Sequence, residues 1–332
     1  MNSLCDSFDM TRLMRDVDAA PSVLNTKPWK FHEVAADRIE LRPDWTRHLK
    51  VIDPRHREPL ISSGAALFNL RMAIRVTGHD PVVWLLPDQQ TGRADVCQGC
   101  GKCCGVGAVL ASVEIVTRRA HPVTVTEQRL YEATPQRHTV REPFSHPIPM
   151  TVAAEQGQAA RMEGAYMRLL HGTDAKRLPR WAARTDQTLK LDDSDVAELK
   201  KWTGSNATPA LGVSADKFGP EPASQRYPPV RDLNLGWPGQ RQVKKKFKRP
   251  QLIALETETD KPSDWMRVGQ AVQRLLLTAA YYPRKRPSSP SSLRRRTGEC
   301  PIPGHPALVA VARVGADGHH GGPDITDIGG HI

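Results

Sequence analysis

Two long helical segments of similar pattern constrain the fold of this chain more than any other feature. The first, residues 57–78 (REPLISSGAALFNLRMAIRVTG), is apolar almost all round. A helix without a polar face has to be buried on several sides. The second, residues 261–282 (KPSDWMRVGQAVQRLLLTAAYY), can be laid on the first so that Gly64 matches Gly269. Such internal similarity is typical of a duplicated unit.

Shorter segments around the long helices predict strands and further helices. Residues 29–34 and 38–44 have the pattern of two short strands joined by three residues, which is typical of a β-hairpin. Further strands are expected at 81–87, 110–116 and 251–259, and further helices at 9–20, from about 126 and at 191–204. Residues 150–170 predict a helix followed by a short strand. Helices and strands are therefore expected along most of the chain.

The chain is strongly basic, with a net charge of +11 in 332 residues. This charge favours anionic partners such as nucleotides, phosphates, nucleic acid or an anionic membrane. Many basic proteins simply have solvated arginine faces, so nucleic-acid binding, which rests on the clusters at 244–248 and 284–296, is disfavoured.

The sequence contains no segment that indicates a membrane or a secretory pathway. No apolar run approaches the ~20 residues that span a bilayer. The N-terminus carries acidic residues and lacks the apolar core of a signal peptide. We therefore expect a cytoplasmic protein without a membrane partner, in which the six cysteines are reduced.

A break follows the first predicted helix, in the segment APSVLNTKPWKF at residues 20–31. Pro21 and Pro28 each lack an N–H group and would clash with a preceding helical turn, so the helix ends here. Trp29 offers a large apolar side chain that can anchor the segment from below. The segment therefore predicts an irregular turn held against the core.

Polar groups in this turn are candidates for ligand contacts. Ser22 and Asn25 provide short donors and acceptors, and the backbone from Pro21 to Val23 leaves the helix with N–H groups that a ligand could use. An alternative is an Asx turn that closes the start of a strand, which would by itself explain Asn25.

A second polar segment, RHTVREPF at residues 137–144, has Arg137, Thr139 and Arg141 at alternate positions. Alternate side chains of an extended segment point to the same side. Two guanidinium groups and a hydroxyl on one side form a suitable site for a phosphate group. The alternative is a basic corner exposed to solvent.

Four of the six cysteines lie in CQGCGKCC, within an apparent insertion at residues 95–108. The spacing suggests a metal site, but it lacks the closing Cys-Pro of a ferredoxin run and a second paired C-x-x-C. An iron–sulfur or zinc site and an irregular thiol-rich loop both remain open, and we assign no metal ligand.

Together these motifs resemble the nitroreductase family of FMN-dependent oxidoreductases, and more closely its actinobacterial, dormancy-associated branch, in which two halves are fused in one chain. APSVLNTKPWKF is similar to the family pattern A-P-S-x-x-N-T-Q-P-W-x-F. RHTVREPF is similar to its R-x-S-x-R corner, and the resemblance covers most of residues 9–281.

The resemblance implies an α+β nitroreductase-like fold with mainly antiparallel sheets and long central helices. The first half would be residues 1–122, the second half residues 123–315, and a tail would follow at 316–332. In the family's usual homodimers, each flavin lies at the subunit interface. Here the first half keeps the turn and the second half keeps the corner, while Met162–Gly164 lie near the place where the second turn would fall.

One flavin site between the halves is therefore implied for each chain, in a monomer with an internal pseudo-dimer or in a homodimer. The residues expected to bind the cofactor are Pro21, Ser22, Val23 and Asn25 of the turn and Arg137, His138, Thr139 and Arg141 of the corner. By resemblance, hydride passes from NAD(P)H to FMN and then to a nitroaromatic or quinone-like acceptor, so no side chain need act as an acid or base.

The alternative is a flavin-binding or sequestering protein with little turnover. A long excursion rich in Gly, Pro and Lys, at residues 204–250, is a candidate lid that would block nicotinamide access. Two departures from the family are also evident: Lys27 stands where Gln is usual, and a basic low-complexity segment at 283–300 follows Tyr282. Either an atypical segment or a frameshift would produce such a C-terminal region.

Overall fold

The computed structural model describes residues 10–87, 108–116, 122–139, 150–173, 193–218, 221–222, 244–245, 252–281 and 310–313. The cysteines at 97–104, Arg141, the basic segment 283–300 and the tail 316–332 lie outside these residues. The expectations that concern them therefore stay predictions.

The first part of the chain forms a four-stranded antiparallel sheet with the order β1-β2-β4-β3. Its elements are α1 (Met10–Asp18), β1 (Trp29–Ala35), β2 (Arg38–Pro43), α2 (Arg57–Val76), β3 (Asp80–Leu85) and β4 (Ala111–Val116), with short 3-10 turns at Val23–Asn25 and Trp45–Arg47. Strands β1 and β2 form the hairpin that their alternating side chains predict. The first long helix is confirmed as α2.

The second part forms a three-stranded sheet with the order β5-β8-β9. Its elements are α4 (Val125–Ala133), α5 (Met150–Met162), β5 (Tyr166–Leu170), α7 (Asp193–Trp202), β8 (Leu252–Glu256), α8 (Pro262–Tyr281) and β9 (Ala310–Arg313), with 3-10 turns at Thr134–Gln136, Gly204–Asn206 and Ala215–Lys217. Strands β5 and β8 are antiparallel, whereas β9 is parallel to β8. A two-residue parallel pair, β6 (Glu221–Pro222) and β7 (Lys244–Lys245), lies apart from both sheets.

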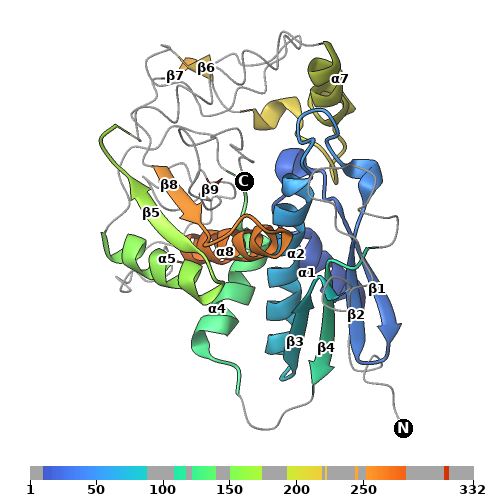
Figure 1. Cartoon of the computed structure of the whole chain (residues 1–332), viewed down its shortest axis with the longest axis vertical. Coiled ribbons are helices and arrows are strands. Elements are labelled where there is room, and N and C mark those ends of the chain that lie inside the picture. Colours follow the sequence, from blue (N-terminus) through green and yellow to red (C-terminus); the bar gives the residue numbers. More distant parts are fainter. Residues whose placement is uncertain are drawn as a thin grey trace, which may run out of the picture.

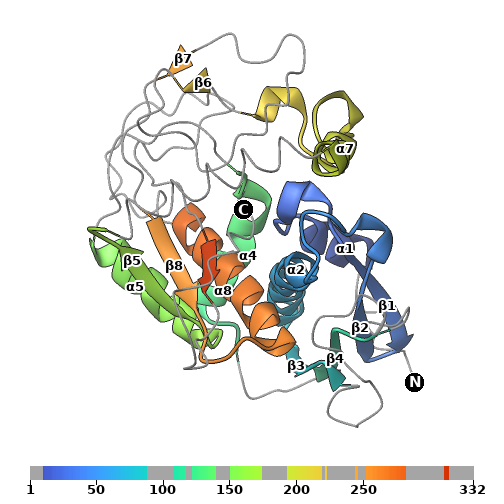
Figure 2. The same cartoon turned by 45° about the horizontal axis from the view of Figure 1, so that its top comes forward.

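Helices α2 and α8 lie side by side in the centre, with one sheet on either side of the pair (Figure 1, Figure 2). Helix α4 packs against both, α1 packs on α2, and α5 packs on α8. The chain is therefore of the α+β class with mainly antiparallel sheets, as expected from the sequence.

Glycine allows the two central helices to come into backbone contact. A Cβ atom at Gly64 would lie 2.2 Å from the carbonyl oxygen of Met266, and one at Gly269 would lie 1.9 Å from the carbonyl oxygen of Ile61. Gly64 and Gly269 are as far apart in the sequence as Ile61 and Met266, so the two contacts are reciprocal. A reciprocal contact of this kind is the signature of a two-fold axis.

The apolar core includes two buried clusters beside the sheets, and each central helix contributes to both. One buried cluster lies against the first sheet and includes Ile39, Leu41, Leu67, Leu70, Ile74 and Val113, together with Met266 of α8. The other lies against the second sheet and includes Ile253, Leu255, Val272 and Leu275, together with Ile61 of α2. Each central helix therefore contributes a side chain to the core of the other sheet.

Candidate functional site

The predicted turn between α1 and β1 is present and has an unusual backbone. Residues Val23–Asn25 form a single 3-10 turn, and Leu24, Asn25 and Lys27 have φ values of 49°, 54° and 47°. Positive φ is uncommon for residues other than glycine and costs free energy unless the surrounding structure fixes it. Packing and hydrogen bonds from the surrounding structure must therefore stabilise the conformation of this turn.

Hydrogen bonds inside the protein use several of the turn's polar groups. The N–H of Val23 donates to the Oγ of Ser62 on α2 at 3.4 Å. The N–H of Asn25 donates to the carbonyl of Ser22 at 3.0 Å, and the N–H of Lys27 donates to the Ser22 hydroxyl at 2.9 Å. The expectation that the N–H groups beyond Pro21 are free for a ligand is therefore wrong for these three, because each already has an acceptor.

The side chain of Asn25 reaches a distant segment of the chain. Its side-chain nitrogen Nδ2 lies 3.1 Å from the carbonyl oxygen of Gly212 and 3.4 Å from that of Ala210. The backbone carbonyl of Asn25 accepts the N–H of Gly212 at 3.1 Å. These partners do not form an Asx turn, which would be local. Lys27, which replaces the family's usual Gln, has its ammonium group 3.6 Å from the Asp18 carboxylate.

The corner follows the 3-10 turn that ends α4. The N–H of Arg137 donates to the carbonyl of Ala133 at 3.0 Å, and its guanidinium Nη2 donates to the carbonyl of Ala19 at 3.3 Å. The Nε atom of Arg137 is buried and has no hydrogen-bond partner among the described residues. Burial lowers the pKa of Arg137 to about 10, so the side chain is still a cation at neutral pH.

The structure thus places the first residue of the predicted corner beside the residue that precedes the predicted turn segment. Ala19 lies two residues before Pro21, and Arg137 reaches it from a position 118 residues further along the chain. The neighbours of Arg137 contribute less: His138 is exposed, with its Nδ1 3.0 Å from the carbonyl oxygen of Gln136, and Thr139 is half-buried. The corner therefore presents a half-buried cation, with a buried Nε, beside the end of α1.

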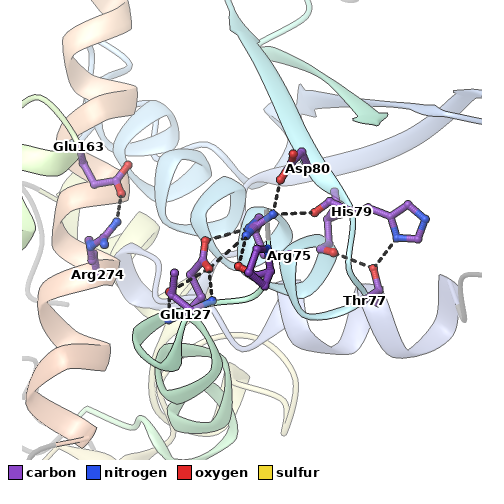
Figure 3. A network of polar contacts seen from close by, with 10 residues as sticks. Arg75, Thr77, His79, Asp80, Glu127, Glu163 and Arg274 are labelled. Carbon is purple, nitrogen blue, oxygen red and sulfur yellow. Dashed lines mark hydrogen bonds and ion pairs between the residues drawn. The ribbon is translucent and has the colours of Figure 1, made fainter. Parts of the chain in front are cut away.

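The corresponding place in the second half has a different occupant. Helix α5 leads to β5 through only Glu163–Ala165, and Glu163 is buried. Its carboxylate lies 2.7 Å from Nη1 of Arg274 (Figure 3) and 2.5 Å from Nη1 of Arg71. A buried ion pair thus occupies the place at which the second half would have a turn.

A second network of polar contacts joins the end of α2 to β3 and α4 (Figure 3). Arg75 contacts the carboxylates of Asp80 at the start of β3 and Glu127 of α4. Hydrogen bonding to Glu127 is the largest contribution that raises the pKa of Arg75. Glu127 also completes a capping box with Thr124, which starts α4 at Val125, one residue before the predicted start. This network is structural, because its charges are paired within the protein.

Sequence reasoning missed Ser62, Gly212 and Ala19 as partners of the motifs. A signal existed for Ser62, because a serine in an otherwise apolar buried helix needs a hydrogen-bond partner. Within the described part of the chain, no group of three or more His, Cys, Asp or Glu residues could hold a metal ion. Among the described helices, none combines the length and the apolar character that a membrane span requires.

No family model matches the chain. Several proteins of Mycobacterium tuberculosis are similar to it over 78% of its length. "Putative NAD(P)H nitroreductase Rv3131" is 29% identical over 266 residues, which cover 70% of that protein. "Uncharacterized protein Rv3127" is 26% identical over 262 residues, which cover 71% of it, and "Putative NAD(P)H nitroreductase acg" is 25% identical over 262 residues, which cover 73% of it. The resemblance to actinobacterial nitroreductase-like proteins is therefore confirmed.

Proposed function

We propose that this chain is an FMN-dependent NAD(P)H oxidoreductase of the nitroreductase type that reduces a nitroaromatic or quinone-like acceptor. The proposal includes a nitroreductase-like fold of two halves, residues 1–122 and 123–315, with one flavin site per chain between them. The similarity to relatives named as NAD(P)H nitroreductases supports the type of reaction.

The observation that carries the cofactor assignment is the unpartnered Nε of Arg137. A buried donor without an acceptor costs about 1–3 kcal/mol, and more when the group is charged. An anion at this corner would remove that cost through a charge-assisted hydrogen bond. The phosphate of FMN fits this requirement, and Arg141, which lies outside the described residues, would supply a second guanidinium group.

The turn fits FMN in a different way from the corner. The N–H groups of Val23 and Lys27 and the side-chain amide of Asn25 already have partners, so the turn can offer the isoalloxazine ring shape and apolar contact more readily than new donors. When bound, FMN supplies the hydride chemistry by taking two electrons from NAD(P)H and giving them to the acceptor. The protein's part is to bind the phosphate, position the ring and exclude water from it.

The place of the turn in the second half supports a stoichiometry of one flavin per chain. Glu163 and its arginine partners Arg71 and Arg274 occupy it, so this place offers neither the turn nor an unpaired guanidinium group to a cofactor. We therefore expect one FMN per chain rather than two. Isothermal titration of the purified protein with FMN gives this number directly.

A flavin-sequestering protein with little turnover is the second candidate. It is favoured by the packing of residues 199–218 against the turn, since Leu199, Trp202, Val213 and Phe218 share a buried cluster with Val23 and Leu24. Steady-state oxidation of NADH or NADPH, measured with FMN-loaded protein and a nitroaromatic or quinone acceptor, separates the two. Turnover supports the oxidoreductase; full flavin loading without turnover contradicts it and leaves the sequestering protein.

A further inference from the structure

The segment from α7 to Phe218 lies in the sequence between β5 and β8 of the second sheet, but it packs against the turn that follows α1. Strands β1 and β2 are joined by Ala36 and Asp37, whereas the chain between β5 and β8 makes an excursion that contains α7. Both views place α7 beside the loops that follow α1 and β2 (Figure 1, Figure 2). We call residues 193–218 the strap.

Apolar side chains hold the strap to the turn. Leu199, Trp202, Val213 and Phe218 of the strap are buried in one cluster with Val23 and Leu24 of the turn and Leu49 of the following loop. Glu198 adds a polar contact, because its carboxylate accepts the N–H groups of Val51 and Ile52, both at 3.0 Å. The strap is therefore attached to the first half at two places, the turn and the loop before α2.

Asn25 connects the strap and the turn through its side chain and its backbone. Its Nδ2 group has two hydrogens, and two strap carbonyls, those of Ala210 and Gly212, lie within hydrogen-bond distance. Both donors of the amide therefore have acceptors in the strap. The reciprocal bond from the N–H of Gly212 to the Asn25 carbonyl fixes the residue from the other side.

Gly212 is required where the strap meets Asn25. Its φ is +86°, and a Cβ atom there would lie 2.8 Å from the carbonyl oxygen of Trp202 and 2.9 Å from the Cβ of Ala207. Both the conformation and the close approach favour glycine at this position. The geometry of the strap is therefore as closely specified as that of the turn it contacts.

We propose that the strap holds the turn in its left-handed conformation and that Asn25 is a positioning residue, which acts on the flavin through the strap and not by direct contact. The part that concerns flavin rests on the proposed function. The part that concerns the turn does not, since it follows from the hydrogen bonds and the buried cluster.

The first experiment measures hydrogen exchange by mass spectrometry in the full-length protein without added FMN. Asn25→Asp keeps the shape and the tolerance for positive φ but removes both amide donors. We expect exchange in peptides that contain Gly212 and Val213 to accelerate about 10-fold, the factor that one net hydrogen bond corresponds to. Peptides from α2 and α8 should be unchanged.

The matched control is Asn206→Asp. The side-chain amide of Asn206 donates to the carbonyl of Lys200 at 2.8 Å within the strap itself and is exposed. This variant should leave exchange at Gly212 as in the wild type. Wild-type exchange at Gly212 in Asn25→Asp would overturn the proposal, as would equal acceleration in both variants.

The second experiment is a double-mutant cycle on FMN affinity. Gly212→Ala disturbs the strap without changing any side chain of the turn, and Thr208→Val does so more gently by removing the hydroxyl that accepts the N–H of Leu211 at 3.0 Å. If Asn25 acts through the strap, Asn25→Asp and either strap variant each weaken FMN binding about 3- to 10-fold, and the combination is no weaker than the stronger single variant.

Multiplicative losses in the cycle would mean that Asn25 contacts FMN directly, and they would overturn the positioning role. If the wild-type protein binds no FMN, the proposed function fails, and the exchange experiment still decides whether Asn25 couples the strap to the turn. The two failures are therefore distinguishable.

Discussion

The parts of this molecule on the two sides of the central helices are alike where α2 meets α8 and different where the candidate site lies. At the helix crossing, Gly64 approaches the backbone of Met266 in the same way as Gly269 approaches that of Ile61. In the connection between the first helix and the first strand, α1 leads to β1 through a strained turn at 19–28, whereas α5 leads to β5 through Glu163–Ala165. The contact between the two central helices is reciprocal, whereas the two connections differ in length and conformation.

The difference shows how a two-fold packing of central helices is compatible with the single site that we propose. The longer connection of the first half has room for the turn and for the strap that covers it. The shorter connection, between α5 and β5, contains Glu163, whose carboxylate forms ion pairs with Arg71 and Arg274. The fold can therefore be symmetric in its core without offering two equal binding sites.

The largest loss of stability is expected at the helix crossing, where Gly64→Ala and Gly269→Ala should have equal effects. Gly64→Ala and Gly269→Ala each place a methyl group within about 2 Å of a carbonyl oxygen, so the helices must separate. We expect each variant to lower the free energy of unfolding by about 3 kcal/mol in urea denaturation, since overpacking against backbone is not relieved by rotamer changes.

Gly157→Ala in α5 is the control for the glycine variants. Its Cβ would lie 3.9 Å from the nearest side-chain atom, that of Met167, so it fits. Replacing this helical glycine should stabilise the protein by about 0.5–1 kcal/mol. A large loss in only one of Gly64→Ala and Gly269→Ala would contradict the reciprocal packing.

A somewhat smaller loss of stability is expected at Glu163, for which we predict a structural role and no role in flavin binding. Glu163→Gln removes the charge that faces Arg71 and Arg274, and we expect a loss of about 2 kcal/mol of unfolding free energy. Affinity for FMN should stay as in the wild type, because we propose no flavin site at Glu163. The exposed Glu33→Gln is the control; a loss of flavin binding in Glu163→Gln with stability intact would contradict the account.

The smallest effect is a pH dependence that originates in a histidine pair next to α2. Nε2 of His48 lies 3.0 Å from the carbonyl oxygen of Asp53 and 2.9 Å from Nδ1 of His56, at the start of α2. Burial lowers the pKa of both imidazoles, so the unfolded chain takes up protons before the folded one as the pH falls. The free energy of unfolding should therefore be highest above the ordinary histidine pKa near 6.5 and decrease below it.

A double variant, His48→Gln with His56→Gln, isolates this contribution in urea denaturation at pH 5.5 and 7.5. The difference in stability between the two pH values should become smaller than in the wild type. Asp53, whose pKa is raised by burial, titrates in the opposite sense and is left in place. The charges of Glu198 and Lys50, which also act on the pKa of His48, are unchanged in this variant. An unchanged pH dependence would show that the histidine pair does not sense the solution pH.

Much of the fold could be predicted because its signals are local. Alternation identified the β1–β2 hairpin, and continuous apolar character identified α2 and its buried position. The parallel pairing of β9 with β8 was not predicted, since strand direction depends on a connection far longer than any local pattern.

The candidate site was predicted in its motifs but not in its contacts. The turn and the corner were recognised, and a hydrogen bond joins Arg137 to Ala19 just before the turn. A flavin site between the halves stays a prediction. The partners of Asn25 lie 185 and 187 positions away, and no periodicity links a turn to such a distant segment. For the same reason, the ion pair of Glu163 with Arg274 could not be anticipated from either helix.

The most direct measurement of the central claim compares FMN with riboflavin, which lacks the phosphate, in fluorescence titrations of the wild type and of Arg137→Gln. The account predicts that Arg137→Gln weakens FMN binding roughly 10- to 100-fold, the equivalent of one charge-assisted hydrogen bond, and leaves riboflavin binding unchanged. Arg161→Gln, at an exposed position on α5, should bind both ligands like the wild type. Equal FMN affinity in Arg137→Gln and the wild type, or equal losses for FMN and riboflavin, would contradict the claim that this corner holds the phosphate.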